Sequence, residues 1–464
     1  MAIKILYCVY GKFVLNHRYV LTLMLFLSVV CFYSMRLCLH IALTKIAMPT
    51  PVKKEVQEEV CPGNNTQILE GGSYNWSEKD QGIILLSFFP GYILTHVPGG
   101  LLADKIGGKP ILSTCVIVSV LVTFLTPVVI MNLHWAFLVV LRFILGIVQG
   151  PSFPAIATLL AAWVPRQERS TLVGLVFSGV FLGSVTGNLV SGLLMAHLKS
   201  WPVVFYAWGI ISVFWCVGFQ VLCYSRPSLH PYITDEEKEY LEREIGPVKS
   251  FKTPWKAILT DSAVLSLIII QAGHDWITYT FIVDLPKFFN DVLKLDIGYT
   301  GMATAISFGL MWIFSIICGW ISDFLINREI MTIIQMRKLY GIISSLGPCL
   351  CSVLATYMGC NQVLVITWLW IGMILMGPWF PGPKVNNLDI TLHFTGIVMA
   401  LSNGTGVLSG IITPYLVAVI APDGTLRQWQ LVFWVSFIVC TASTVVFVVW
   451  GSGTRSKWDY VEDE

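Results

Sequence analysis

The chain has 464 residues, of which 55% are hydrophobic and 12% are charged, whereas an ordinary soluble domain carries about 25% charged residues. A water-soluble core cannot hide so many apolar side chains, and apolar runs near the ~20 residues that cross a bilayer recur along the whole chain. The composition therefore excludes a soluble globular enzyme. The formal net charge of +2 gives no reason to expect a nucleic-acid partner, since such a surface needs clustered Lys and Arg.

Hydropathy predicts an all-α polytopic membrane protein with about twelve transmembrane helices. The first apolar run, from Tyr19 to Leu43, is too long for a signal-peptide core and has no small-residue cleavage site behind it. We therefore expect it to be retained as the first span. The predicted spans lie near residues 19–43, 82–103, 110–132, 135–163, 171–195, 203–224, 262–284, 298–325, 338–358, 362–383, 394–420 and 429–450.

The loops between these spans predict the orientation. Lys and Arg gather in the loops on the side of both termini, which predicts that both termini are cytoplasmic. The loop at about 44–81 then lies outside and carries glycosylation sequons at Asn64 and Asn75. Cys61 and Cys360 would also lie outside, where a disulfide can form, although one sequence cannot pair them.

A polar segment divides the chain. Residues 225–258 form the longest polar stretch and are predicted to be a cytoplasmic linker with a short amphipathic helix. This linker separates a first six-helix half, residues 1–224, from a second six-helix half with a cytoplasmic tail, residues 259–464.

The two halves share a sequence motif. Gly-x-x-x-Asp ends the second span at residues 100–104 and the eighth span at residues 319–323, with basic residues just beyond. The separation from Gly187 to Gly406, in the fifth and eleventh spans, equals that between the two motifs. One constant offset at two unrelated features predicts a duplicated six-helix unit. The motif residues are Gly100, Asp104, Lys105, Gly107, Lys109, Gly319, Asp323 and Arg328.

Closely spaced glycines mark the fifth and eleventh spans. Gly179, Gly183 and Gly187 recur at every fourth residue and predict a smooth stripe that permits close helix packing. A sharper hypothesis is that this stripe, with Gly406 and Gly410 opposite, is the surface on which the two halves rock.

These motifs resemble those of a known family. Residues 100–109 resemble the loop motif of the major facilitator superfamily, and Arg142-x-x-x-Gly146-x-x-x-Gly150 resembles its fourth-helix motif. Other segments look like solute carrier family 17, which holds the type I sodium/phosphate cotransporters, sialin and the vesicular glutamate transporters. These segments are Tyr74-Asn75-Trp76, Ser87-Phe88-Phe89, Gly91-Tyr92-Ile93, Pro98-Gly99-Gly100, Phe153-Pro154-Ala155, Glu168-Arg169-Ser170 and Ser402-Asn403-Gly404. Within that family, His274-Asp275-Trp276 and residues 284–287 look like the invertebrate inorganic phosphate cotransporters.

Three cations remain well inside the predicted spans: Arg36, Arg142 and Lys384. Burying a cation in a bilayer costs at least ~2.5–3.5 kcal/mol, so these side chains are expected to face a polar cavity. A guanidinium binds a carboxylate or phosphate through two parallel hydrogen bonds, and we predict that Arg36 and Arg142 form an oxyanion clamp. The alternative is a pair of structural charges. For Lys384, snorkelling to the surface explains the charge as well as ligand binding does.

The resemblance carries over unevenly to individual residues. Arg36 and Arg142 match the family's anion-binding arginines. Gln149 stands where sialin and the vesicular glutamate transporters have a glutamate linked to proton coupling, and a glutamine cannot carry a proton. His274 stands where the glutamate transporters have an arginine. Gln149 and His274 complete the predicted substrate-binding set, while the resemblance weighs against glutamate loading.

Two buried acids, Asp275 and Asp389, are the candidates for binding a co-transported Na⁺ or H⁺. For Asp389 we favour a structural role, either capping the eleventh helix or pairing with a gate charge. The resemblance also implies that Asp104 and Asp323, each near basic loop residues, form a cytoplasmic latch.

These expectations combine into a secondary-active anion transporter that works by alternating access, with a small anion and the lipid bilayer as partners. A sodium-dependent symporter of inorganic phosphate or an organic anion is the favoured function. The alternatives are a proton-coupled or potential-driven transporter of a sugar acid, urate or amino acid, an anion channel, and a transport-dead receptor. No cofactor is expected, and no catalytic motif predicts an enzyme. The plasma membrane is favoured over an endolysosomal or vesicular membrane, and a monomer is compatible with the sequence, which leaves the oligomeric state open.

Overall fold

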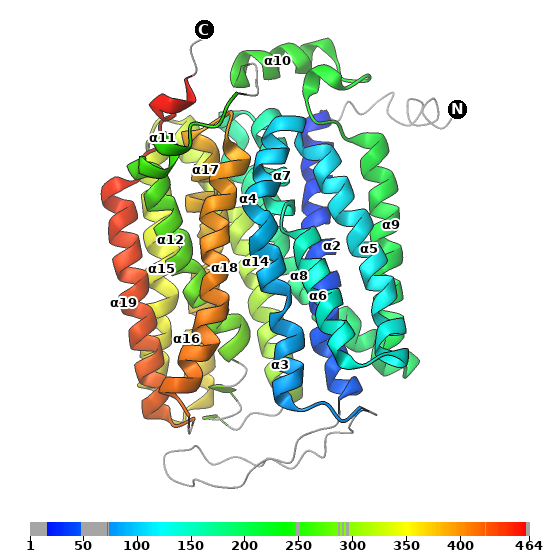
Figure 1. Ribbon diagram of the computed structural model, residues 1–464. Coiled ribbons are helices and arrows are strands. Elements are labelled where there is room, and N and C mark those ends of the chain that lie inside the picture. Colours follow the sequence, from blue (N-terminus) through cyan, green and yellow to red (C-terminus); the bar gives the residue numbers. More distant parts are fainter. Residues whose placement is uncertain are drawn as a thin grey trace.

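The computed structural model describes residues 16–47, 72, 74–246, 251–285, 288–289, 292–293, 297–422 and 424–460. These residues form a bundle of long helices that run side by side, with two short helices, α10 (Asp235–Ile245) and α11 (Trp255–Thr260), at one end (Figure 1). We call the end that carries α10 and α11 the linker face. Among the described residues, the β-structure is a single isolated bridge between Ala47 and Tyr74.

The first half begins with a helix longer than its predicted span, and two of its spans are built from paired helices. The second predicted span is formed by α3 and α4, and the fourth by α6 and α7. The elements are α2 (His17–Ile46), α3 (Glu78–Leu86), α4 (Phe88–Ile106), α5 (Gly108–Asn132), α6 (Trp135–Gln149), α7 (Ser152–Trp163), η1 (Arg166–Glu168), α8 (Arg169–Leu198) and α9 (Pro202–Leu222).

The second half repeats this arrangement after the linker. Its tenth span is broken into α16, η4, η5 and α17. The elements after α9 are η2 (Pro227–Leu229), α10, α11, α12 (Ser262–Tyr279), η3 (Thr280–Asp284), α14 (Ile297–Asn327), α15 (Ile333–Thr356), α16 (Gln362–Leu375), η4 (Gly377–Trp379), η5 (Phe380–Lys384), α17 (Val385–Ile390), α18 (Thr395–Ile420), α19 (Leu426–Trp450) and η6 (Lys457–Asp459).

Eleven helices of the described chain are long and apolar enough to cross a membrane. The seventh predicted span, α12, is not among them, although it packs in the bundle against α18 and α19. Its second half carries Gln271, His274 and Asp275, and these polar residues lower its mean hydropathy. A helix surrounded by protein needs less apolar surface than one exposed to lipid. We therefore count α12 with the eleven apolar helices, which gives twelve long helices in the described bundle.

The Gly-x-x-x-Asp motif of the first half joins α4 to α18 of the second half. A side chain at Gly100 would lie 2.6 Å from the carbonyl oxygen of Gly396, so only glycine allows this approach. One turn later on the same face, the Asp104 carboxylate accepts hydrogen bonds from the backbone N–H groups of Gly396 (2.9 Å) and Ile397 (3.0 Å). Asp104 therefore caps the N-terminus of α18 across the interface.

The second copy of the motif makes the reciprocal contact between α14 and α8. A side chain at Gly319 would lie 3.1 Å from the carbonyl oxygen of Ser170. The Asp323 carboxylate accepts from the backbone N–H groups of Ser170 (3.0 Å) and Thr171 (2.6 Å) at the start of α8. Each half thus caps a helix of the other. The two acids accept backbone N–H groups of the opposite half, so each links one half to the other. Among the described residues, neither forms an ion pair with a basic loop residue.

The glycine stripe does not lie between the halves. A Cβ atom at Gly179, Gly183 or Gly187 of α8 would lie 2.7–3.0 Å from atoms of Phe26, Tyr33 and Ser34 of α2, within the same half. The rocking-surface hypothesis is therefore wrong for this stripe, because its smooth face is already filled by α2. In the second half the equivalent residues behave alike: Gly406 contacts Asp275 and Gly410 contacts Tyr279, both on α12.

A buried charge cluster completes the closure at the linker face. Asp389 on α17 accepts from Arg169 at the start of α8 (3.2 Å) and from Arg337 on α15 (2.8 Å). Arg337 also donates to the Ser170 hydroxyl at 2.8 Å. Hydrogen bonds between described residues of the two halves gather at this face and around Asn403. The linker face is therefore held closed.

Candidate functional site

A cavity lies between the two halves, and both halves line it. Its polar and aromatic lining comes from α2, α4, α7 and α8 of the first half and from α12, the broken tenth span and α18 of the second. The lining residues used below are Tyr33, Arg36, Tyr92, Phe153, Gln271, His274, Asp275, Tyr279, Trp379, Lys384 and Asn403. The arrangement brings together residues that are far apart in sequence, as expected for a site at the interface of two repeats.

Lys384 reaches this cavity because its helix is broken. Pro381 and Pro383 remove two backbone donors, and Gly382 between them has the non-helical angles φ −99° and ψ −113°. The side chain of Lys384 is only 1% exposed and does not reach the surface. Snorkelling, one of the two explanations weighed for Lys384, is therefore excluded in this structure.

Neutral amides hold the Lys384 ammonium group. Its Nζ donates to the side-chain oxygens of Asn403 (2.7 Å) and Gln271 (3.1 Å). The rings of Phe153 and Phe177 lie 5.6 and 5.8 Å from Nζ and add weaker cation–π attraction. Within the described residues, no carboxylate lies within ion-pair distance of this buried cation.

Arg36 lines the same cavity from α2. Its guanidinium carbon lies 4.2 Å from the centre of the Phe88 ring and 4.8 Å from that of Phe89. These aromatic faces orient the group without neutralising its charge. Arg36 forms no ion pair in the part of the chain that the structure describes.

Arg142 lies behind Arg36 and does not line the cavity. Its guanidinium donates to the backbone carbonyl oxygen of Arg36 at 3.4 Å, and the residue is 4% exposed. The predicted two-arginine clamp is therefore not formed in this conformation. Gln149, on the same helix, is also buried away from the cavity, and its amide nitrogen has no hydrogen-bond partner among the described residues. It does not contribute to the cavity wall in this structure.

His274 and Asp275 both reach the cavity, although they are adjacent on α12. The His274 ring stacks on Trp379, with ring centres 3.7 Å apart and an angle of 5° between the planes. The Asp275 carboxylate accepts from the Gln271 amide at 2.8 Å and packs on Gly406. Asp389, by contrast, lies in the charge cluster at the linker face and pairs with two arginines. It is therefore a structural charge in this conformation, and of the two acids only Asp275 lines the cavity.

Sequence reasoning missed the residues that tie the cavity together. In the sequence, Asn403 was noted only within Ser402-Asn403-Gly404, one of the segments that carry the family resemblance. In the structure its amide nitrogen lies 3.3 Å from the Tyr92 hydroxyl and 3.3 Å from His96 Nε2 on α4, while its oxygen binds Lys384. Asparagine, glutamine and histidine inside apolar spans are the signal that could have identified this network.

Several predicted residues lie at the ends of the bundle, away from the cavity. Gly107 ends α4 with φ +96°, a conformation that favours glycine, and Lys109 donates to the Gln220 carbonyl oxygen at 3.0 Å. Lys105 and Arg328 are exposed.

The predicted outer residues are only partly described. Asn75 is exposed, whereas Asn64 and Cys61 lie outside the described residues. Cys360 is disulfide-bonded.

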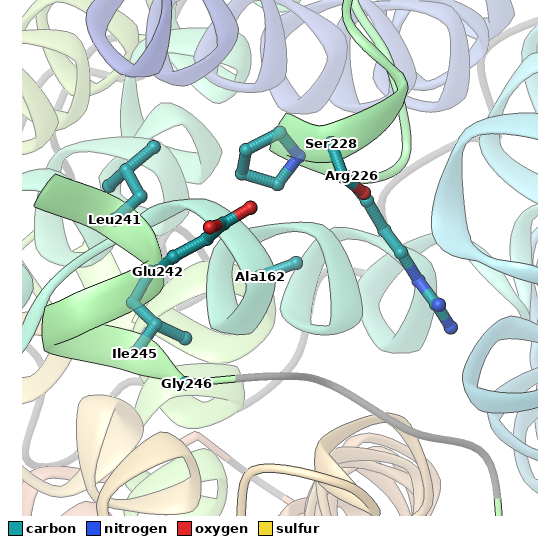
Figure 2. Close-up of a pocket in the computed structure, with 8 residues that line it drawn as sticks. Ala162, Arg226, Ser228, Leu241, Glu242, Ile245 and Gly246 are labelled. Carbon is teal, nitrogen blue, oxygen red and sulfur yellow. The ribbon is translucent and has the colours of Figure 1, made fainter. Parts of the chain in front are cut away.

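A second pocket lies at the linker face, between η2, α7 and α10. Figure 2 shows the Glu242 side chain pointing into it and the Arg226 side chain running along its edge. Glu242 is exposed and Arg226 is half-buried, so solvent already stabilises both charges. We therefore place the candidate functional site in the central cavity.

Two helical halves around a central polar cavity, closed at one face, define a membrane transporter. The sequence pattern of the Major Facilitator Superfamily matches residues 14–387. The fold resembles the solved structure of the major facilitator proton:xylose symporter XylE, with a TM-score of 0.70, 13% identity and coverage of 95% of this chain and 97% of that one. These findings confirm the predicted fold.

Curated relatives narrow the assignment. A Drosophila melanogaster protein named "Putative inorganic phosphate cotransporter" is 31% identical over 96% of this chain and 87% of its own length. Human sialin is 29% identical over 95% of this chain and 90% of its own length. The chain therefore belongs to the major facilitator superfamily and, within it, to solute carrier family 17.

Proposed function

We propose that the protein is a secondary-active anion transporter that carries inorganic phosphate or an organic anion together with sodium. One observation carries the proposal: Arg36 and Lys384 line the cavity without an ion-pair partner among the described residues. A cation held in a low-dielectric site is costly unless an opposite charge approaches it. An anionic substrate would supply that charge. The names of the relatives, a phosphate cotransporter and sialin, support the same class of cargo.

Charge balance supports a co-transported cation. A membrane potential that is negative inside opposes anion entry by about 2.3 kcal/mol per charge per 100 mV, so uptake needs a second driving force. Asp275 is the acid that lines the cavity in the described chain, and its carboxylate accepts from Gln271, which also binds Lys384. We propose Asp275 as the group through which sodium, or alternatively a proton, is coupled to anion movement.

The proposal includes a direction. We infer that the linker face is cytoplasmic, because the basic loops gather there and Asn75 lies exposed at the opposite end of the bundle. The conformation described, closed at the linker face, would then be one in which the substrate enters from outside. Loss of a glycan-dependent mass shift in an Asn75→Gln variant would support this orientation, and cleavage of a linker-face tag by external protease would overturn it.

Uptake of radiolabelled phosphate into cells that express the full chain at their surface tests the function. Sodium is replaced by choline in one arm and the pH is varied in another. We expect saturable uptake that needs sodium and that falls at least tenfold in Arg36→Ala, because a buried charge-assisted bond to the anion is lost (roughly 1.5–3 kcal/mol). Arg243→Ala is the matched control, since Arg243 is exposed on α10 and belongs neither to the cavity nor to the loop motif.

The outcomes separate the alternatives. Uptake that persists without sodium but follows a proton gradient would overturn sodium coupling and leave anion transport intact. If well-expressed protein moves neither phosphate nor organic anions under any gradient, the transporter proposal itself fails and a receptor remains. Equal loss in Arg36→Ala and Arg243→Ala would mean that the cavity arginine has no special part in transport.

A further inference from the structure

Lys384 is the most deeply buried cation of the cavity wall, and the residues around it are arranged to hold it without neutralising it. Both of its described acceptors are side-chain amides. An ammonium group has three N–H donors, so a third remains for a ligand. A surface lysine would be stabilised by water instead, but Lys384 is only 1% exposed.

Hydrogen bonds to the amide nitrogens fix both side chains so that their oxygens, and not their nitrogens, face Lys384. The Gln271 nitrogen donates to Asp275 at 2.8 Å, and this fixes its oxygen toward Lys384. The Asn403 nitrogen lies 3.3 Å from both Tyr92 and His96 of the other half, and this fixes its oxygen in the same way. The ammonium group is therefore positioned before any ligand arrives, at a point where the two halves meet. Preorganisation of this kind is typical of a binding group.

We propose that Lys384 is an anion-binding residue of the cavity, and that its charge makes the cavity prefer oxyanions with two negative charges over those with one. The inference deepens the proposed function and rests on it, because it assumes that the cavity binds an anion. Asp275 is the one acid that lines the cavity in the described chain, and its single negative charge can offset only one of the two lining cations, Arg36 and Lys384. Lys384 therefore gives the cavity an excess positive charge, and Arg142 behind Arg36 adds to it.

The preference follows from Coulomb's law. The attraction between Lys384 and a ligand scales with the product of their charges, so a dianion gains about twice what a monoanion gains at the same distance. Removing the charge should therefore weaken dianion binding more than monoanion binding. General disruption of the cavity would weaken both alike. The ratio of the two affinities separates these cases.

The experiment measures that ratio with the full chain in proteoliposomes. Uptake of labelled phosphate is inhibited by succinate, a dianion, and by lactate, a monoanion, at a pH where both are fully ionised. The wild-type protein should bind succinate more tightly than lactate. Lys384→Met should reduce this preference roughly tenfold, and Lys384→Arg, which keeps the charge, should retain it.

A second measurement covers the case in which Lys384→Met no longer transports. The shift of the melting temperature on adding phosphate, succinate or lactate is recorded for the purified protein, since a ligand that binds the folded state stabilises it. The wild type should be stabilised most by the dianions, and Lys384→Met should lose that difference. Lys256→Met is the matched control, because it removes the same charge from an exposed residue of α11, outside the cavity, and should keep the difference.

The results that would overturn the inference are distinct from those that would overturn the function. If the wild type transports anions and Lys384→Met keeps the wild-type ratio of succinate to lactate affinity, the inference about Lys384 fails and the proposed function stands. If Lys384→Arg loses the preference as fully as Lys384→Met, charge is not the cause and the inference fails again. If the wild type neither transports nor is stabilised by any of the three anions, the proposed function fails first.

Discussion

Arg337 and Lys384 are equally buried, at 1% exposure each, but their surroundings differ. Arg337 at the linker face donates to the Asp389 carboxylate at 2.8 Å and to the Pro381 carbonyl oxygen at 2.8 Å. Lys384, three residues after Pro381, donates only to neutral amides among its described partners. The charge of a buried cation that pairs with a carboxylate is neutralised within the protein. The charge of a buried cation that contacts only amides is not, and a bound anion could neutralise it. The helix break at Pro381–Lys384 therefore separates the charge cluster at the linker face from the cavity lysine that we propose binds the anion.

The largest expected effect comes from removing the paired cation. Arg337→Met takes away the partner of a buried carboxylate, and breaking such a pair costs about 3–5 kcal/mol. Lys384→Met removes a cation that has no such partner, and we expect the melting temperature to stay the same or rise. Thermal unfolding of the purified proteins in detergent measures both.

Lys338→Met is the control for this pair, because Lys338 follows Arg337 on α15 and is only half-buried. We expect a change within about 0.5 kcal/mol. If Lys384→Met lowers the melting temperature as much as Arg337→Met does, the proposed difference between the two cations is wrong. The cavity lysine would then also stabilise the fold.

The two interface caps should have smaller and equal effects. Asp104→Ala leaves the backbone donors of Gly396 and Ile397 without a side-chain acceptor, and Asp323→Ala does the same to Ser170 and Thr171. Loss of a helix cap costs about 1–2 kcal/mol. The cost falls on the conformation closed at the linker face, because both caps cross the interface. Each variant should therefore shift the population toward opening at that face.

Distances between spin labels at Lys105 and Lys256, which are both exposed at the linker face, report that shift. A double variant should open further than either single variant, since the two caps lie at separate contacts. If both variants keep the wild-type distance distribution, the caps stabilise each half by itself and do not control the gate.

The sequence allows the fold to be predicted more completely than the site. Apolar runs set the helix positions, and the repeated Gly-x-x-x-Asp motif identified two equivalent contacts. Their partners could not be predicted, because the N–H groups that Asp104 binds belong to α18, almost three hundred positions away along the chain. The prediction for the glycine stripe of α8 failed because the spacing of the glycines reveals a smooth helix face but not which helix packs against it. The structure assigns that role to α2.

The candidate site was only partly visible in the sequence. Arg36, His274 and Asp275 were found because charged or titratable residues are rare inside apolar spans. Arg142 satisfies the same rule, yet it points to the backbone of Arg36, because helix rotation rather than sequence position decides which side chain faces the cavity. The place of Lys384 depends on the break at Pro381 and Gly382. Asn403 is uncharged, so a search of the apolar spans for charged residues could not find it.

The effect that should be smallest at neutral pH concerns His230, a buried histidine that stays neutral in the folded state. His230, in the linker after η2, lies 4.1 Å from the ring of His17, and burial followed by the nearby His17 lowers its pKa from 6.5 to about 4. Its folded state therefore stays neutral while the unfolded chain takes up a proton as the pH falls below 6.5. Stability should decline across that window and level off near the folded pKa. His230→Gln should flatten this part of a pH series of melting temperatures, whereas His134→Gln, at an exposed site, should leave the slope unchanged. An unchanged slope in His230→Gln would mean that docking of the linker is insensitive to this proton.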